Sequence, residues 1–238
     1  DSKTMRLSIV AGVPNAPETP TATAGNKQVT LIWNDPVAKS GVTVTYYIIN
    51  FVKPKGEHDD DGEGDEEQNG SYQVNGTEHT YTVTGLNNGL PYTFTITAKS
   101  AGGNGLPSTS VTATPFAPPS APKSVTAVRD RNGISVRWKK PDDNGGSKVS
   151  KWILECVDSA NSSVKVRKAF NEGEDGEEHG DDGQNKYVLK GSDGLIAGHK
   201  YRCHVIGVNK KKNGDEVEGT QSGDSEEVTL ETVQTTHR

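Results

Sequence analysis

The sequence predicts an all-β protein made of two tandem antiparallel sandwiches with seven strands each. Short stretches in which apolar and polar residues alternate, such as Val29, Leu31 and Trp33, indicate strands with one buried face. The 27 glycines and 12 prolines indicate many turns, and no long stretch has the apolar spacing of a helix. The chain also repeats itself at about half its length, which indicates two copies of one unit.

The internal repeat starts close to the beginning of the chain. With a shift of 105 residues, "APETPTATAGNKQVTLIWNDP" at 16–36 falls on "APKSVTAVRDRNGISVRWKKP" at 121–141 without a gap. Further along, the shift becomes 109, and "GLNNGLPYTFTITA" falls on "GLIAGHKYRCHVIG". The aligned residues that we expect to build the two cores are Trp33 and Trp138, Tyr47 and Trp152, Leu86 and Leu195, and Tyr92 and Tyr201.

Each copy resembles the fibronectin type III family. The resembling features are a proline at the start of the unit, a tryptophan that ends the second strand, an aromatic residue that opens the third, and a leucine followed six residues later by a tyrosine. The stretch "WKKPDDNGGSKVSKWILE" at 138–155 is similar to the second-to-third strand region of the family. The first copy departs from it, with "AKSG" in place of "DDNGG". The resemblance implies immunoglobulin-like sandwiches of seven strands.

The repeat also divides the chain into segments. The proline-rich "PFAPPSAP" separates the two copies, and prolines stiffen a linker towards an extended conformation. The first residues resemble the last strand of a preceding unit, which suggests a segment of a longer array. We expect an N-terminal extension at 1–13, a first domain at 14–115, a linker at 116–121, a second domain at 122–231 and a tail at 232–238.

Two acidic, glycine-containing stretches interrupt the repeat, "EHDDDGEGDEEQNG" at 57–70 and "NEGEDGEEHGDDGQ" at 171–184. They hold 15 of the 32 acidic residues, and the other 17 face 26 Lys and Arg, so the rest of the chain is mildly basic. The first stretch is expected in the loop between the third and fourth strands, and the second between the fourth and fifth. Because strands alternate in direction, both loops are expected to face the junction between the domains.

Three explanations of the acidic stretches remain open. Calcium takes six to eight oxygen ligands, which such loops can supply, although neither stretch has the EF-hand spacing. Alternatively, the charges are solvated, or they contact a basic partner or the lysine loop of the second domain, Lys210, Lys211 and Lys212. The candidate calcium ligands are Asp59, Asp60, Asp61, Glu63, Asp65, Glu66, Glu67, Glu174, Asp175, Glu177, Glu178, Asp181 and Asp182.

The two cysteines, Cys156 and Cys203, align with Phe51 and Phe94 of the first copy, so both are expected to face the core. They lie on strands that neighbour one another in the family. A disulfide between them requires a register that brings their Cα atoms within about 7 Å. The sequence favours two buried thiols that act as small apolar side chains, with the disulfide as the alternative.

Function is predicted from the same features. No catalytic motif, metal-ligand spacing or basic patch with aromatic residues is present, which argues against an enzyme and against nucleic-acid binding. No apolar run is long enough to insert into a membrane. The resemblance implies a structural, adhesive or protein-binding module of a larger extracellular or surface protein, without a cofactor other than candidate calcium. The alternatives are an intracellular filament-associated scaffold, or accessory domains of a secreted enzyme.

Overall fold

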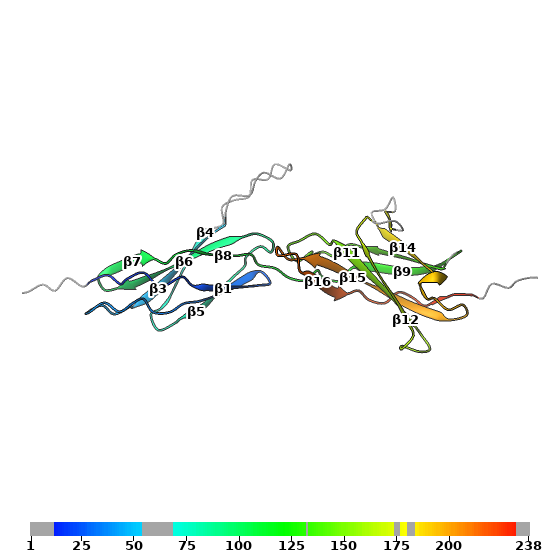
Figure 1. Ribbon diagram of the computed structural model, residues 1–238, viewed down its shortest axis with the longest axis horizontal. Coiled ribbons are helices and arrows are strands. Elements are labelled where there is room, and N and C mark those ends of the chain that lie inside the picture. The colour runs from blue at the N-terminus through cyan, green and yellow to red at the C-terminus, as the bar shows by residue number, and fades with distance from the viewer. Residues whose placement is uncertain (1–11, 54–68, 132, 174–176, 180–183, 232–238) are drawn as a thin grey trace, which may run out of the picture. The chain divides into compact units, whose positions relative to one another are not determined.

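The chain forms two compact units, Asp1–Phe116 (unit 1) and Ala117–Arg238 (unit 2), each of them an antiparallel β-sandwich (Figure 1). A single 3₁₀ turn, Gly191–Asp193, is the only helix in the part of the chain that the structure describes. The computed structural model describes residues 12–53, 69–131, 133–173, 177–179 and 184–231.

Unit 1 consists of a three-stranded and a five-stranded sheet. Along β3 and β6 every second residue is buried, so the alternation in the sequence becomes one core face and one outer face. The first sheet has the order β1-β2-β5: Thr21–Gly25, Gln28–Ile32 and Thr80–Thr84. The second has the order β4-β3-β6-β7, with β8 also on β6: Asn69–Asn75, Tyr46–Val52, Tyr92–Ser100, Gly103–Pro107 and Val111–Ala113.

Unit 2 repeats this arrangement with one additional strand. The strand β13 pairs antiparallel with the outer side of β14, a position that no described strand occupies in unit 1. One sheet has the order β13-β14-β10-β9: Glu177–His179, Asn185–Lys190, Gly133–Lys139 and Lys123–Asp130. The other has the order β12-β11-β15-β16, with β17 also on β15: Lys165–Asn171, Lys151–Asp158, Lys200–Lys210, Glu216–Gln221 and Val228–Thr229.

The last strand of each sandwich is interrupted. It forms β7 and β8 in unit 1 and β16 and β17 in unit 2, and each pairing has a register shift. Where the strand is interrupted, a serine hydroxyl accepts a hydrogen bond from the backbone of the neighbouring strand. Ser108 Oγ accepts one from Ile96 N at 3.0 Å, and Ser222 Oγ accepts one from Val205 N at 2.9 Å. The seven-stranded plan is therefore confirmed, with the seventh strand in two pieces and β13 added.

The two cores are built around an equivalent aromatic pair. The rings of Trp33 and Tyr47 are 5.5 Å apart with an interplanar angle of 67°, and Trp138 and Trp152 have the same distance and angle. This identity shows that the repeat in sequence is a repeat in packing. The eight residues aligned from the sequence are all buried: Trp33, Tyr47, Leu86, Tyr92, Trp138, Trp152, Leu195 and Tyr201.

A tyrosine near the start of β6 in unit 1 and of β15 in unit 2 holds the turn that precedes the strand. The Tyr92 hydroxyl accepts a hydrogen bond from Asn87 N, and the Tyr201 hydroxyl accepts one from Ile196 N, both at 2.9 Å. A buried hydroxyl without a partner would cost free energy. The turn before each strand supplies that partner.

A polar residue on the sixth strand binds the segment that leads into each unit. Ser100 Oγ donates a hydrogen bond to the Gly12 carbonyl at 2.8 Å, and the aligned Asn209 donates through Nδ2 to the Ala117 carbonyl at 3.1 Å. Ala117 N also donates to the Gly145 carbonyl at 3.0 Å. Gly145 has a φ of +72°, and a Cβ there would lie 1.8 Å from the Ala117 oxygen, so this approach requires glycine.

Candidate binding surfaces

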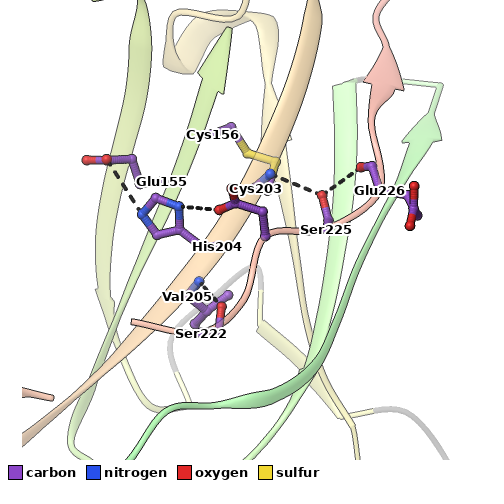
Figure 2. Close-up of a disulfide and its surroundings, with 9 residues drawn as sticks. Glu155, Cys156, Cys203, His204, Val205, Ser222, Ser225 and Glu226 are labelled. Atoms are coloured by element: carbon purple, nitrogen blue, oxygen red, sulfur yellow. Dashed lines mark hydrogen bonds and ion pairs between the residues drawn. A yellow bond between two sulfur atoms is a disulfide. The ribbon is translucent and has the colours of Figure 1, made fainter. Parts of the chain in front are cut away.

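The two cysteines form a disulfide inside one sheet. Cys156 on β11 lies directly opposite Cys203 on β15, with 4.0 Å between their Cα atoms, and both are fully buried (Figure 2). The prediction of two free buried thiols is therefore wrong, because the strand register places Cys156 and Cys203 opposite one another. In unit 1 the equivalent residues, Phe51 and Phe94, are also opposite one another, with 6.2 Å between their rings.

The outer face of the same strands carries a buried histidine between two carboxylates. His204 follows Cys203 in the chain and lies 3.6 Å from Glu155 through Nε2 (Figure 2). Its Nδ1 atom lies 3.2 Å from Asp224. His204 and Glu155 are 5% and 8% exposed. The carboxylates approach opposite nitrogens of the ring. Metal ligands would converge on one point, and these groups do not. Glu155 Oε2 also lies near the Lys165 ammonium, at 3.3 Å.

Ion pairs extend this arrangement across the sheet β12-β11-β15-β16. Lys151 lies 2.6 Å from Glu216 and holds the pKa of that carboxyl below its usual value, mainly through a hydrogen bond. Arg167 lies 2.9 Å from Glu218. The face is therefore charged and balanced. The same outer face also carries a small buried apolar cluster of Ile153, Ile206 and Val208, separate from the main core.

The lysine loop begins at the end of β15. Lys210 lies 3.6 Å from Glu216, and Lys211 and Lys212 are exposed on the turn that follows. The contact between these lysines and the acidic stretches stays a prediction.

The equivalent face of unit 1 has a different chemistry. Its outward residues on β3 are Tyr46, Ile48, Asn50 and Val52, and Lys99 is the only charged residue on β3, β4 or β6. Tyr46 and Val52 are 42% and 47% exposed. The two units therefore present unlike surfaces on the same fold.

Two carboxylate–histidine pairs link segments that are distant in sequence. Asp35 Oδ1 accepts a hydrogen bond from the Tyr47 hydroxyl at 2.6 Å and lies 3.0 Å from His79 Nε2. These contacts, that from Tyr47 above all, hold the pKa of Asp35 below its usual value. In unit 2, His199 likewise bonds to Asp158 and, as the main cause, lowers the pKa of that carboxyl. The sequence carries no signal for either pair, because the strand register brings them together.

Most of the candidate calcium ligands lie outside the described residues. Glu177 and Glu178 are described, and they lie on β13, opposite Tyr187 and Lys186 of β14. The expectation that the second acidic stretch is entirely a loop is therefore wrong, since part of it pairs as a strand. Within the described residues no group of three or more His, Cys, Asp or Glu is placed to hold a metal ion. The ligands outside them are Asp59, Asp60, Asp61, Glu63, Asp65, Glu66, Glu67, Glu174, Asp175, Asp181 and Asp182.

None of the helical structure in the described ranges has the length and apolar character that crossing a bilayer requires.

Curated relatives match about half of the chain. The Kelch domain-containing protein SSO1033 of Saccharolobus solfataricus is 30% identical over 134 residues, which is 56% of this chain and 16% of the relative. Fibronectin type-III domain-containing protein 3A of Mus musculus is 30% identical over 139 residues, which is 53% of this chain and 11% of the relative. The chain therefore corresponds to a small part of the length of these relatives.

Solved structures with tandem domains are also similar. A segment of two fibronectin type III domains from chicken tenascin has a TM-score of 0.46 and 17% identity, over 86% of this chain and 98% of the other. The FN1–FN3 domains of chicken CNTN1 have a TM-score of 0.42 and 18% identity, over 92% of this chain and 68% of the other.

The family assignment follows from the repeat, the two sandwiches and one further match. The model of the fibronectin type III domain matches residues 15–114 and again residues 118–222. These two ranges cover most of the chain and coincide with the two units described above. The chain therefore belongs to the fibronectin type III family.

Proposed function

We propose that the two units are protein-interaction modules of a larger modular protein, located outside the cell or on its surface, and that they have no catalytic role. Membership of the fibronectin type III family supports the interaction role. The proposed location rests on a single observation, the buried disulfide between Cys156 and Cys203. Disulfides persist in oxidising compartments and are rare in the cytosol. This favours the extracellular alternative over the intracellular scaffold.

The redox state of the two cysteines in native material tests this location. We expect mass spectrometry, after alkylation under denaturing and non-reducing conditions, to find the peptides of Cys156 and Cys203 joined. A sample reduced before alkylation serves as the control for the separate peptides. If both cysteines of native protein carry the alkyl group without reduction, the extracellular proposal fails and the intracellular scaffold replaces it.

The acidic stretches belong to the same proposal as sites for calcium or for a basic partner. Clustered carboxylates can supply the oxygen ligands that calcium requires. We expect calorimetric titration of the whole chain with calcium to show saturable binding that magnesium does not reproduce. The triple variant Asp59→Asn with Asp60→Asn and Asp61→Asn should bind calcium more weakly. Equal, salt-sensitive heats for both ions would contradict a calcium site and leave solvated charge, or a contact with the lysine loop or a basic partner.

A further inference from the structure

The strand β5 leaves one side of unit 1 open for pairing. It is the outer strand of the sheet β1-β2-β5, and among the described residues no strand pairs with its other side. Its sequence, "TYTVT" at 80–84, contains neither a charged residue nor a proline. Charged residues, prolines and covering segments are the devices by which natural sheets prevent pairing at an edge. This edge has none of them in the described part of the chain.

The phase of the β2–β5 hydrogen bonds shows which backbone groups face the open side. Trp33 N donates to the His79 carbonyl at 3.0 Å, so these opposite residues form a hydrogen-bonded pair. In an antiparallel ladder such pairs alternate with pairs that are not hydrogen-bonded. The N–H and C=O groups of Thr80, Thr82 and Thr84 therefore point away from β2 and towards the open edge.

Unit 2 demonstrates that this edge accepts an added strand. Its strand β14 is the equivalent of β5, because Tyr187 faces Val136 as Tyr81 faces Leu31. There β13 pairs antiparallel with β14. The same position on β5 carries no described strand, so a segment from another molecule can occupy it.

The sequence of β5 matches itself under a two-fold rotation. With the axis at Thr82, Thr80 lies opposite Thr84 of the second copy and Tyr81 lies opposite Val83 of the second copy. Threonine–threonine and aromatic–β-branched pairs are favourable across antiparallel strands. We propose that β5 pairs with β5 of a second copy of this chain, which makes one six-stranded sheet from the two three-stranded sheets. A two-fold contact of this kind is closed and does not propagate into a fibre.

A row of threonines that already exists in one copy supports this partner. The hydroxyls of Thr30 and Thr82 are 2.9 Å apart on the outer face of β2 and β5. The second copy would continue the row with its own Thr82 and Thr30. The same operation on β14 would instead place Lys186 opposite Lys190, and like charges across strands repel. Self-pairing is therefore specific to unit 1.

This inference names one partner for the interaction role proposed above and rests on that role, but it does not depend on the cellular location. Three residues on each copy offer backbone groups, so the contact is small. Small contacts become effective when several are linked in one array, because linkage raises the local concentration. The second copy is thus expected to bind weakly as a free fragment.

Sedimentation equilibrium of the whole chain, from micromolar to millimolar concentration, tests the proposal. We expect a concentration-dependent dimer. Thr80→Lys with Thr84→Lys, which copies the lysine pattern of β14, should weaken the dimer about tenfold or more because it places two pairs of like charges across the contact. Thr80→Lys with Thr84→Glu should restore it, because the same two-fold axis then places the introduced lysine of each copy opposite the introduced glutamate of the other.

Two controls make the outcomes decisive. Ser71→Lys with Gln73→Lys adds the same charge to β4, an outer strand of the other sheet of unit 1, and should leave the dimer unchanged. Near-ultraviolet circular dichroism should confirm that each variant is folded. A wild-type chain that stays monomeric, a dimer that the double lysine variant on β5 leaves intact, or a dimer that only the β4 variant loses overturns the proposal. A monomer would overturn self-pairing only, and an interaction role with other partners would stand. The cellular location is tested separately by the thiol measurement.

Discussion

Reduction of the Cys156–Cys203 disulfide is expected to lower the free energy of unfolding of unit 2 by about 4 kcal/mol. The bond joins residues 47 positions apart, so in the oxidised chain it restricts the unfolded state of unit 2 to conformations that close this loop. Unit 1 has no cysteine, and its equivalent residues are Phe51 and Phe94. Its stability should be unchanged. Urea unfolding with and without reductant, monitored by hydrogen exchange at the level of individual peptides, measures the stability of each unit separately.

A pair of variants distinguishes loss of the bond from loss of packing. Cys156→Val with Cys203→Val removes the bond but keeps two apolar side chains at the buried positions. It should therefore match the reduced wild type to within about 1 kcal/mol. A variant as stable as the oxidised protein, or a reduction that weakens both units equally, would show that the bond does not stabilise unit 2 in this way.

Trp138→Ala is expected to destabilise unit 2 by about 3–5 kcal/mol. Trp138 is fully buried, and its ring contacts Trp152 at 5.5 Å and Phe170 at 6.1 Å, so the truncation leaves a cavity in the centre of the core. Denaturant unfolding with each unit followed separately measures the loss. The matched variant Trp33→Ala should act in the same way on unit 1.

Trp138→Phe separates the two contributions of the indole. The Nε1 atom of Trp138 is buried and has no hydrogen-bond partner among the described residues, so phenylalanine removes no hydrogen bond seen there and relieves an unpaired donor. The loss should be clearly smaller than with alanine. Equal losses for both substitutions would mean that ring packing does not account for the contribution of Trp138.

Much of the fold could be predicted from the sequence because the same pattern occurs twice. The alignment of Trp33 with Trp138 and of Phe51 with Cys156 identified core positions that the two units share. The alignment cannot report which atoms meet across a strand pair. The disulfide depends on Cys156 lying directly opposite Cys203, and a shift of one residue would have turned one of them to the outer face.

The binding surfaces were harder to predict for the same reason. Glu155 and His204 belong to no motif in the sequence, and they meet because β11 and β15 place them opposite one another on the outer face. The strand β13 was hidden within an acidic stretch whose composition indicates a solvated loop. Pairing with β14 outweighs that local preference, since backbone hydrogen bonds do not depend on the side chains.

The hydrogen bonds that Asn209 makes to the segment before β9 have a mechanical consequence. Asn209 donates to the carbonyl groups of Ala117 and Asn144, and Thr220 N donates to the Pro119 carbonyl at 3.0 Å. A tensile force applied at the N-terminal side of unit 2 would therefore pass first into β15, β16 and the loop before β11. The first strand would bear load only after these bonds rupture. In an array under tension, the hydrogen bonds of Asn209 and Thr220 would together set the force at which the unit begins to open.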